Sequence, residues 1–202
     1  MAKAIGFYIG KENSGFNPDI FSVGLSIQTI RHAGYVVTVW SIKPITLELS
    51  KDYISLAFDG KNNLMDRNVV IELLDDSIRI HNDWLGSIPV FYNKKDGIVS
   101  TISNLCLVGK DIDYKGLTNY LSFGYSAFER TVFKDVKFMR YYSELTVKAG
   151  VVNISYKDDP VLDPSFEEEA TDEFDVIAQM QDYVSRIESG TKGDIVLPTS
   201  GG

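Results

Sequence analysis

A hydroxyl side chain followed by two glycines is the pattern in this chain best suited to binding an anion. It stands at Ser200, Gly201 and Gly202, directly after an apolar run at 195–197 that predicts a short buried strand. Glycine lets backbone N–H groups approach an oxyanion closely, and a helix after the loop would add its partial positive charge. Taken alone, the pattern is more often an ordinary turn than a phosphate site.

Other residues with catalytic potential are few. The two histidines, His32 and His81, are far apart in sequence, and neither has a metal-ligand spacing to a cysteine or a carboxylate. His81 with Asp83 could be half of an acid–base pair, but a hydrogen-bonded structural histidine at a strand end is the commoner case. Cys106, between two leucines, predicts a buried and inert thiol. We expect no metal site and no catalytic group in residues 1–190.

Composition favours a cytoplasmic protein. The 202 residues carry 20 basic and 28 acidic side chains, a net charge of −8, which argues against a nucleic-acid partner or an anionic membrane surface. A single cysteine fits a reducing compartment. The N-terminus has no signal-peptide pattern, and no apolar run is long enough to span a membrane.

Most of the chain from residue 35 to residue 156 predicts short strands divided by turns. The strand segments in this region share β-branched and aromatic residues: 36–42, 53–58, 68–74, 77–81, 89–92 and 98–101. Residues 3–9, before this region, are also predicted to form a strand. Asp96-Gly97 and Ala149-Gly150 predict two hairpin turns. Two helices are expected, at 103–108 and at 114–121, the second with Asp113 as N-cap and Gly124 as stop. This pattern indicates an α+β sandwich of antiparallel sheets.

Two parts of this region allow more than one interpretation. Asn17-Pro18 is a plausible helix start, with a stop at Gly34, whereas the alternating apolar residues from Phe21 to Ile27 favour a strand. The aromatic residues Phe123, Tyr125, Phe128, Tyr141 and Tyr142 are most simply expected in the core. Apolar residues at 125–133 fit a core or an interface equally well, so a homodimer stays open.

A linker divides the chain into two expected domains, 1–157 and 165–202. Residues 158–164 contain two prolines and three acidic residues. A long helix follows, with a capping box of Ser165 and Glu168, an apolar face and a stop at Gly190. A helix followed by the strand at 195–197 is the beginning of an α/β unit, and parallel strands need a crossover after such a strand. We therefore expect the chain to stop inside a second domain.

Several segments, in order, resemble the asparagine synthetase family. Asp83–Tyr92 is similar to the R-D-x-[FL]-G-x-[RK]-P-L-[YF]-Y segment of its class II glutamine amidotransferase domain. The segments that follow are similar to the family's (A)SE-x-K-x-LL and L-x-x-YL-x-x-G helices, its T-x-F-x-x-I motif and its P-G-x-x-L hairpin: 100–108, 117–124, 131–136 and 143–154. Residues 196–202 resemble the opening of the S-G-G-x-D-S pyrophosphatase loop. The resemblance covers about residues 75–202.

This resemblance implies an N-terminal nucleophile (Ntn) hydrolase-like αββα sandwich of two antiparallel sheets, followed by the first helix and strand of an α/β synthetase domain. Complete members adenylate a carboxylate with Mg-ATP, release pyrophosphate and let an amine attack. Small-molecule carboxylate and amine substrates, ATP and Mg²⁺ are therefore implied for the full-length protein. Ser200, Gly201 and Gly202 would hold pyrophosphate, and the fragment itself is expected to be inactive and to need no cofactor.

Departures from the family pattern concern glutamine hydrolysis. The family's glutaminases need cysteine as the first residue of the mature chain, whereas Ala2 follows Met1 here. The R-G-P-D, N-G-E-x-Y-N and S-D-x-E segments are also absent, with Asp59-Gly60 as the nearest counterpart of the second. This resembles β-lactam synthetase-like members and lasso-peptide cyclases, and we expect no glutaminase activity. The alternatives are a non-catalytic scaffold or dimerisation domain, and a glutamine-dependent amidotransferase whose true N-terminal cysteine is not shown.

Overall fold

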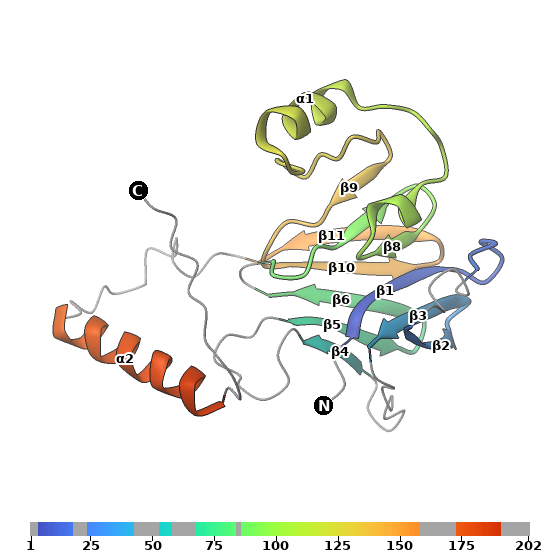
Figure 1. Cartoon of the computed structure of the whole chain (residues 1–202). Helices are drawn as coiled ribbons and strands as arrows, with labels where there is room; N and C mark the ends of the chain where they lie inside the picture. Colours follow the sequence, from blue (N-terminus) through green and yellow to red (C-terminus); the bar gives the residue numbers. More distant parts are fainter. Residues whose placement is uncertain are drawn as a thin grey trace. The chain divides into compact units, whose positions relative to one another are not determined.

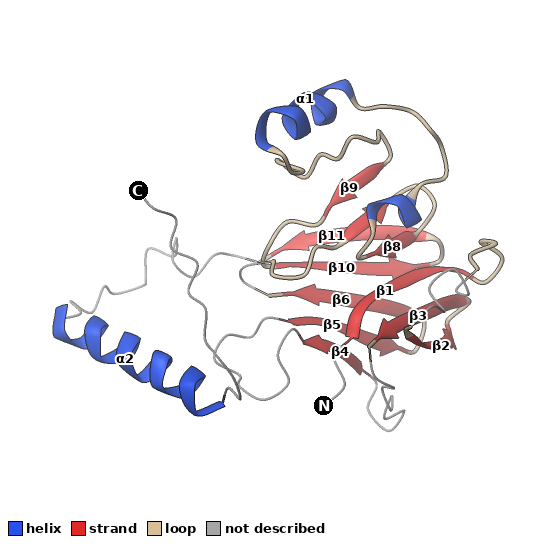
Figure 2. Cartoon of the chain, in the orientation of Figure 1, coloured by secondary structure: helices blue, strands red, loops and turns tan. Residues whose placement is uncertain are grey.

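Antiparallel strands make up most of the described structure (Figure 2). The computed structural model describes residues 4–17, 24–42, 53–57, 68–83, 86–157 and 173–190. The chain divides into two units, Met1–Gly60 with Asp66–Lys157 and Lys61–Met65 with Asp158–Gly202. The first unit contains every described strand, in two sheets, and the second contains one described helix. The class is α+β, as predicted.

The first sheet has six strands in the order β2-β3-β1-β8-β7-β9. Their bounds are Ser26–His32 for β2, Tyr35–Ser41 for β3, Ala4–Lys11 for β1, Ile98–Ser100 for β8, Phe91–Asn93 for β7 and Val136–Phe138 for β9. β1 therefore lies inside the sheet, with β3 on one side and β8 on the other (Figure 1).

The second sheet has five strands in the order β11-β10-β6-β5-β4. Their bounds are Val151–Tyr156 for β11, Ser143–Lys148 for β10, Ser77–Asn82 for β6, Asn68–Leu74 for β5 and Tyr53–Ala57 for β4. All pairings between the described strands of both sheets are antiparallel, and β6 lies at the centre of the second sheet, between β5 and β10.

The two sheets pack face to face around one apolar core. Phe7 and Ile9 of β1 point to the same side as Val37 and Val39 of β3, because these residues are paired in register. The second sheet contributes buried aliphatic residues to the same cluster: Ile54, Val69, Ile71, Ile78, Ile80, Leu145, Val147 and Val152. Burial of these side chains from two separate sheets is the main favourable term holding the sandwich together.

Both faces of the first sheet are covered, which explains why β3 is apolar almost throughout. On the face away from the core, Phe16 stacks on Tyr8 with ring centroids 3.8 Å apart. A short 3₁₀ helix, Ser103–Cys106, packs on β7 and β8 on this side and buries Cys106 in a second apolar cluster with Trp40. The expected helix at 103–108 is thus shorter than predicted.

The two hairpin turns predicted from their residue types are confirmed. Gly97 and Ala149-Gly150 have positive φ at the two predicted turns, which join β7 to β8 and β10 to β11. α1 spans Tyr114–Phe123, with Asp113 as N-cap and Gly124 in the left-handed region, as expected. The helix considered for 17–34 is wrong over its described second half. There, β2 and β3 form a hairpin through Ala33-Gly34, whose φ angles of 49° and 79° a helix cannot adopt.

The second unit contributes α2, Glu173–Gly190. It ends at the predicted stop, and Arg186 pairs with Asp182 one turn earlier. The predicted linker 158–164, the capping box of Ser165 with Glu168 and the strand at 195–197 lie outside the described residues. Over the part of the chain that the structure describes, no helix is long and apolar enough to cross a membrane.

Candidate functional site

The predicted anion-binding loop, Ser200, Gly201 and Gly202, lies outside the described residues. So do Ala2, at the nucleophile position of the family, and Asp59-Gly60. Pyrophosphate binding and the missing nucleophile therefore stay predictions. The described structure begins with β1, at Ala4.

The hydroxyl groups of Ser100 and Thr101, which lie beside β1, form hydrogen bonds with backbone groups. The N–H of Phe7 donates to Oγ1 of Thr101 at 3.1 Å, and the hydroxyl of Ser100 donates to the Phe7 carbonyl at 2.8 Å. Oγ of Ser100 also accepts the N–H of Ile102 at 3.1 Å. Both hydroxyls thus fasten β8 to β1. None of the hydrogen bonds found for them in the described structure comes from a general base.

Protein side chains also fill the space over Gly6. A Cβ atom on Gly6 would lie 2.2 Å from Oγ1 of Thr101 and 2.8 Å from the indole of Trp40. Contacts this short exclude a side chain, so β1 has glycine where Trp40 crosses it. This part of β1 is therefore built for packing.

The segment that carries the family resemblance connects the two sheets. β6 of the second sheet ends at Asn82, and β7 of the first sheet begins at Phe91. The carboxylate of Asp83 accepts the N–H of Ser87 at 3.0 Å, and its carbonyl accepts the N–H of Gly86 at 3.1 Å. Gly86 has φ of 59°, a conformation that favours glycine. The motif's aspartate and glycine thus build the turn between the sheets.

Asn82 joins this connection to the strand beyond it. Its Nδ2 donates to the Arg140 carbonyl at 2.7 Å, and its Oδ1 accepts the N–H of Ser143 at 2.8 Å. The carbonyl of Asp83 also accepts the N–H of Tyr142 at 3.1 Å. The side chains of Asn82 and Asp83 therefore have structural partners, which agrees with the structural interpretation of the segment from residue 81 to residue 83.

His81 belongs to a charged tetrad on the outer face of the second sheet, formed by Glu72, Arg79, His81 and Glu144. Nε2 of His81 lies 3.3 Å from Oε2 of Glu72, and Nδ1 lies 3.5 Å from Oε2 of Glu144. Arg79 contacts the same two carboxylates, at 3.3 Å through Nη1 and at 3.4 Å through Nε. The acidic members of the tetrad lie on β5 and β10, and Arg79 and His81 lie between them on β6.

Sequence reasoning missed the tetrad for a physical reason. Glu72 and Arg79 face each other across the β5–β6 hairpin, so a correct register could have paired them. Glu144 reaches His81 only through the pairing of β10 with β6, which joins distant parts of the sequence. Within the described ranges, no group of three or more histidine, cysteine, aspartate or glutamate side chains is arranged to hold a metal ion.

Cys106 is fully buried, as predicted, and its Sγ contacts the Phe91 carbonyl at 3.4 Å. Burial raises the pKa of the thiol to about 12, because the thiolate would lose its hydration, and the hydrogen bond from the Ser100 backbone offsets only part of this. A thiol with such a pKa supplies almost no nucleophile near neutral pH.

We expect native Cys106 to react with an aromatic disulfide reagent at pH 8 at least a thousandfold more slowly than in urea, where the pKa returns to about 8.5. The release of the coloured thiol measures the rate. Fast, stoichiometric labelling of the folded chain would show that the thiol is accessible and ionised, against this assignment.

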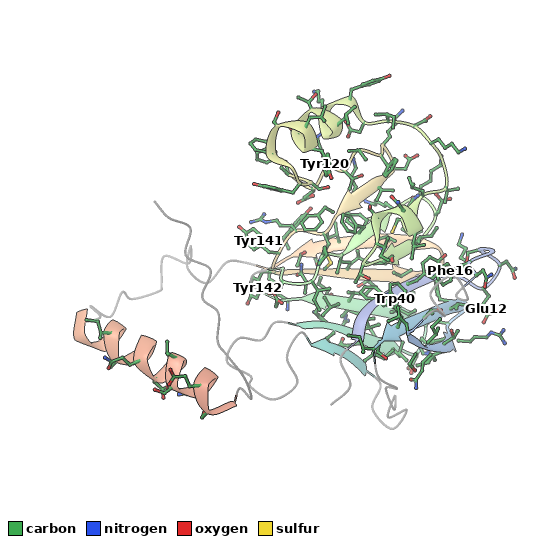
Figure 3. All side chains as sticks on the ribbon, in the orientation of Figure 1. Glu12, Phe16, Trp40, Tyr120, Tyr141 and Tyr142 are labelled. Carbon is green, nitrogen blue, oxygen red and sulfur yellow. The ribbon has the colours of Figure 1, made fainter. Side chains whose placement is uncertain are left out.

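The expectation that Phe123, Tyr125, Phe128 and Tyr141 lie in the core is wrong, and Tyr142 is half-buried. Phe123 and Tyr125 are exposed, Phe128 is 80% exposed, and Tyr141 is also on the surface. Large apolar side chains of α1 are exposed as well: Tyr114, Tyr120 and Leu121. In Figure 3, Tyr120 is labelled between α1 and the strands of the sandwich.

Polar contacts at its beginning attach α1 to the sandwich. The Asp113 carboxylate accepts the N–H groups of Lys115 and Gly116 at 3.1 Å and pairs with Arg130 at 2.9 Å. Burial opposes its charge, but the Gly116 hydrogen bond and the nearby cations Arg130 and Lys137 outweigh this, so the pKa of Asp113 is lowered. Asp113 is therefore a capping and pairing carboxylate in its ionised form.

Tyr92 and Tyr156, two tyrosines whose pKa values are affected by Glu129, are neutral side chains. The hydroxyl of Tyr156 donates to Oε2 of Glu129 at 3.0 Å. Burial raises the pKa of Tyr92 to about 12, and the charge of Glu129 adds to the effect. The pKa of Tyr156 is also raised, first by burial and then by the hydrogen bond and charge of Glu129. Neither tyrosine can therefore serve as an ionised base near neutral pH.

Comparisons with known proteins give no match: neither the family models searched nor the curated proteins compared show a significant similarity to this chain. The functional interpretation therefore depends on the residues and their geometry.

Proposed function

We propose that this chain is the amidotransferase-like, glutaminase-inactive part of an ATP-dependent amide ligase similar to asparagine synthetases. The observation that carries the proposal is the Asp83–Val90 connection between the two sheets. Asp83 and Gly86 form a hydrogen-bonded turn within the segment that resembles the family motif. The segments that resemble the family after it form a 3₁₀ helix, a capped helix and a hairpin, in the same order.

The proposal assigns the sandwich a structural role within the ligase. Two antiparallel sheets around a shared core support an Ntn hydrolase-like domain, although the two helices described in this unit, the 3₁₀ helix Ser103–Cys106 and α1, do not form a layer over the outer face of the second sheet. That face carries the charged tetrad. The hydroxyls beside β1 are bonded to backbone, which supports the absence of glutamine hydrolysis.

Carboxylate activation belongs, in this proposal, to the part of the protein that begins with Ser200, Gly201 and Gly202. A hydroxyl and two glycine N–H groups have the donor chemistry that pyrophosphate needs. Bound Mg-ATP would supply the adenylate-forming chemistry there. The compartment is proposed to be the cytoplasm, and the substrates are a small carboxylic acid and an amine.

The glutaminase half of the proposal is tested by ammonia release from L-glutamine. We expect the purified chain to release no more ammonia than a boiled control. The Ala2→Cys variant, with Met1 removed, should also stay at background, because the family's glutamine-binding segments are absent. Release of ammonia by the unmodified chain would refute this half of the proposal.

The ligase half is tested on the native gene product by carboxylate-dependent exchange of pyrophosphate into ATP. We expect exchange, and we expect Ser200→Ala to reduce it about tenfold or more while leaving the melting temperature unchanged, since it removes one hydrogen bond to a charged group. A gene product that does not bind ATP would contradict this half.

A non-catalytic scaffold or dimerisation domain is the second candidate. The exposed aromatic side chains on and after α1 favour it, because exposed apolar side chains fit a binding role. The two candidates differ in ATP binding, which only the ligase requires.

A further inference from the structure

We propose that Arg140 is the anion-binding group of a small-molecule site, which takes its ligand through an oxyanion, either a carboxylate or a phosphate group. The site lies at one end of the second sheet, where β10 begins at Ser143 and β11 ends at Tyr156, two residues that pair in register. Figure 3 labels Tyr141 and Tyr142 at this end of the strands. The inference does not require the ligase function. We call the site the Arg140 site and define it by Arg140, Tyr141, Tyr142, Tyr156 and Lys157.

Two tyrosine rings hold the guanidinium group of Arg140. Its Cζ lies 5.1 Å from the centroid of the Tyr141 ring and 5.5 Å from the centroid of the Tyr156 ring. At both distances a cation is attracted to the face of an aromatic ring. The Tyr156 side chain is held in turn, because its hydroxyl donates to Oε2 of Glu129 at 3.0 Å. The guanidinium group therefore has a preferred position although Arg140 is exposed.

The N–H donors of this guanidinium group are open to solvent. Arg79, Arg130 and Arg186 each pair with a carboxylate. For the Arg140 side chain, in contrast, the described part of the chain supplies no hydrogen bond and no ion pair, only the two rings. A guanidinium group carries five N–H donors in a planar fork, and contact with a ring face uses none of them. Because this fork matches two oxygens of a carboxylate or a phosphate, Arg140 is an oriented donor for an oxyanion.

The backbone that carries Arg140 is fixed by the connection between the sheets. Its carbonyl accepts hydrogen bonds from Nδ2 of Asn82 at 2.7 Å and from the hydroxyl of Ser143. Tyr142 has φ of 50°, a conformation that bulky residues rarely adopt, and its N–H donates to the Asp83 carbonyl at 3.1 Å. Strained residues of this kind cluster at ligand-binding sites, where the surrounding structure holds them in place. The Arg140 site is thus built on a rigid support, which a binding site needs.

A second cation makes the Arg140 site basic within an acidic chain. Nζ of Lys157 lies 5.4 Å from the centroid of the Tyr142 ring, and the N–H of Lys157 donates to the Tyr142 carbonyl at 3.2 Å. Glu129 supplies a carboxylate at the edge of the site, and that carboxylate accepts the Tyr156 hydroxyl. The whole chain carries a net charge of −8, so the two cations give this site the opposite sign. This favours an anion as the ligand.

The test is an NMR titration of the full 202-residue chain with sodium phosphate and, separately, with sodium acetate, both at constant ionic strength. We expect the Nε–H signal of Arg140 to shift saturably with at least one of these anions, because a charge-assisted hydrogen bond changes its environment. Tighter binding of phosphate would identify a phosphate-bearing ligand, and tighter binding of acetate would identify a carboxylate. Sodium chloride at the same ionic strength should give no saturable shift.

Arg140→Gln is expected to raise the dissociation constant of the bound anion about tenfold or more, since it removes the charged fork. Arg31→Gln is the matched control, because Arg31 is exposed on β2 of the other sheet and its replacement removes the same charge. This control should change the dissociation constant less than about twofold.

An Arg140 signal that does not saturate with either anion would overturn the proposal. Equal effects of Arg140→Gln and Arg31→Gln would overturn it too, because the binding would then follow net charge and not this site. Melting curves of both variants should match that of the parent chain, since both arginine side chains are exposed. If Arg140→Gln unfolds, the titration of the parent chain decides alone.

Discussion

Replacing Asn82 with alanine is expected to lower the free energy of unfolding by about 3 kcal/mol, because it leaves the buried Ser143 N–H without its partner and removes one of the two hydrogen bonds to the Arg140 carbonyl. The Asn82 side chain satisfies the Arg140 carbonyl and the Ser143 N–H and is almost fully buried. For a domain of this size the change corresponds to a fall in melting temperature of roughly 6–12 °C. Urea unfolding followed by tryptophan fluorescence measures it.

The matched control for Asn82 is Asn153→Ala on β11. Asn153 is exposed, so removing its amide should change stability by less than about 0.5 kcal/mol. Equal effects of the two substitutions would show that the connection between the sheets does not depend on Asn82. A selective loss at Asn82 would place a large part of the stability of the sandwich in the link between β6 and β10.

Gly116→Ala is expected to destabilise the protein by about 2 kcal/mol, although the same change inside an exposed helix stabilises it by about 1 kcal/mol. A Cβ atom at this position would lie 1.8 Å from the Thr131 carbonyl oxygen and 2.8 Å from its carbon. Both atoms belong to the backbone, so α1 must move away from the segment that it packs on. The urea midpoint measures the loss.

Gly109→Ala is the control for Gly116. A Cβ atom there meets nothing within 4 Å, and no positive φ is recorded for it, so this change should be nearly neutral. If Gly116→Ala were instead stabilising, helix propensity would outweigh contact with Thr131, and α1 would be more loosely attached than the structure indicates.

Local sequence patterns predicted the hairpins because their causes are local. Gly97 and Ala149-Gly150 sit between apolar segments, and their φ angles are the ones that these turns require. The two ends of α1 could also be predicted from the sequence, because Asp113 and Gly124 each act on the adjacent turn of the helix. The segment containing β2 was ambiguous because a short apolar run fits two periods, and only pairing with β3 decides for a strand.

The main error of the sequence analysis was to predict that several aromatic residues are buried. Phe123, Tyr125 and Phe128 were expected in the core because of their residue type, but burial depends on what a segment packs against. Phe123 ends α1, and Tyr125 and Phe128 lie in the segment after it, where nothing covers these side chains in the described structure, so they are exposed. The tetrad was missed for the related reason that its register is non-local. The predicted site at Ser200–Gly202 is untested.

The position of β1 inside the first sheet sets a time order for the protein's synthesis. Tyr8 pairs with Ser100 and Ile9 with Val99, which lie 92 and 90 positions further along the chain, so one side of β1 stays open until these partners have been made. Contacts of such long range form slowly, because a large loop must close before they are gained. While the ribosome is still translating the middle of the chain, the new N-terminal strand has an unpaired apolar edge. A chaperone that binds extended apolar segments would protect this edge until β8 emerges.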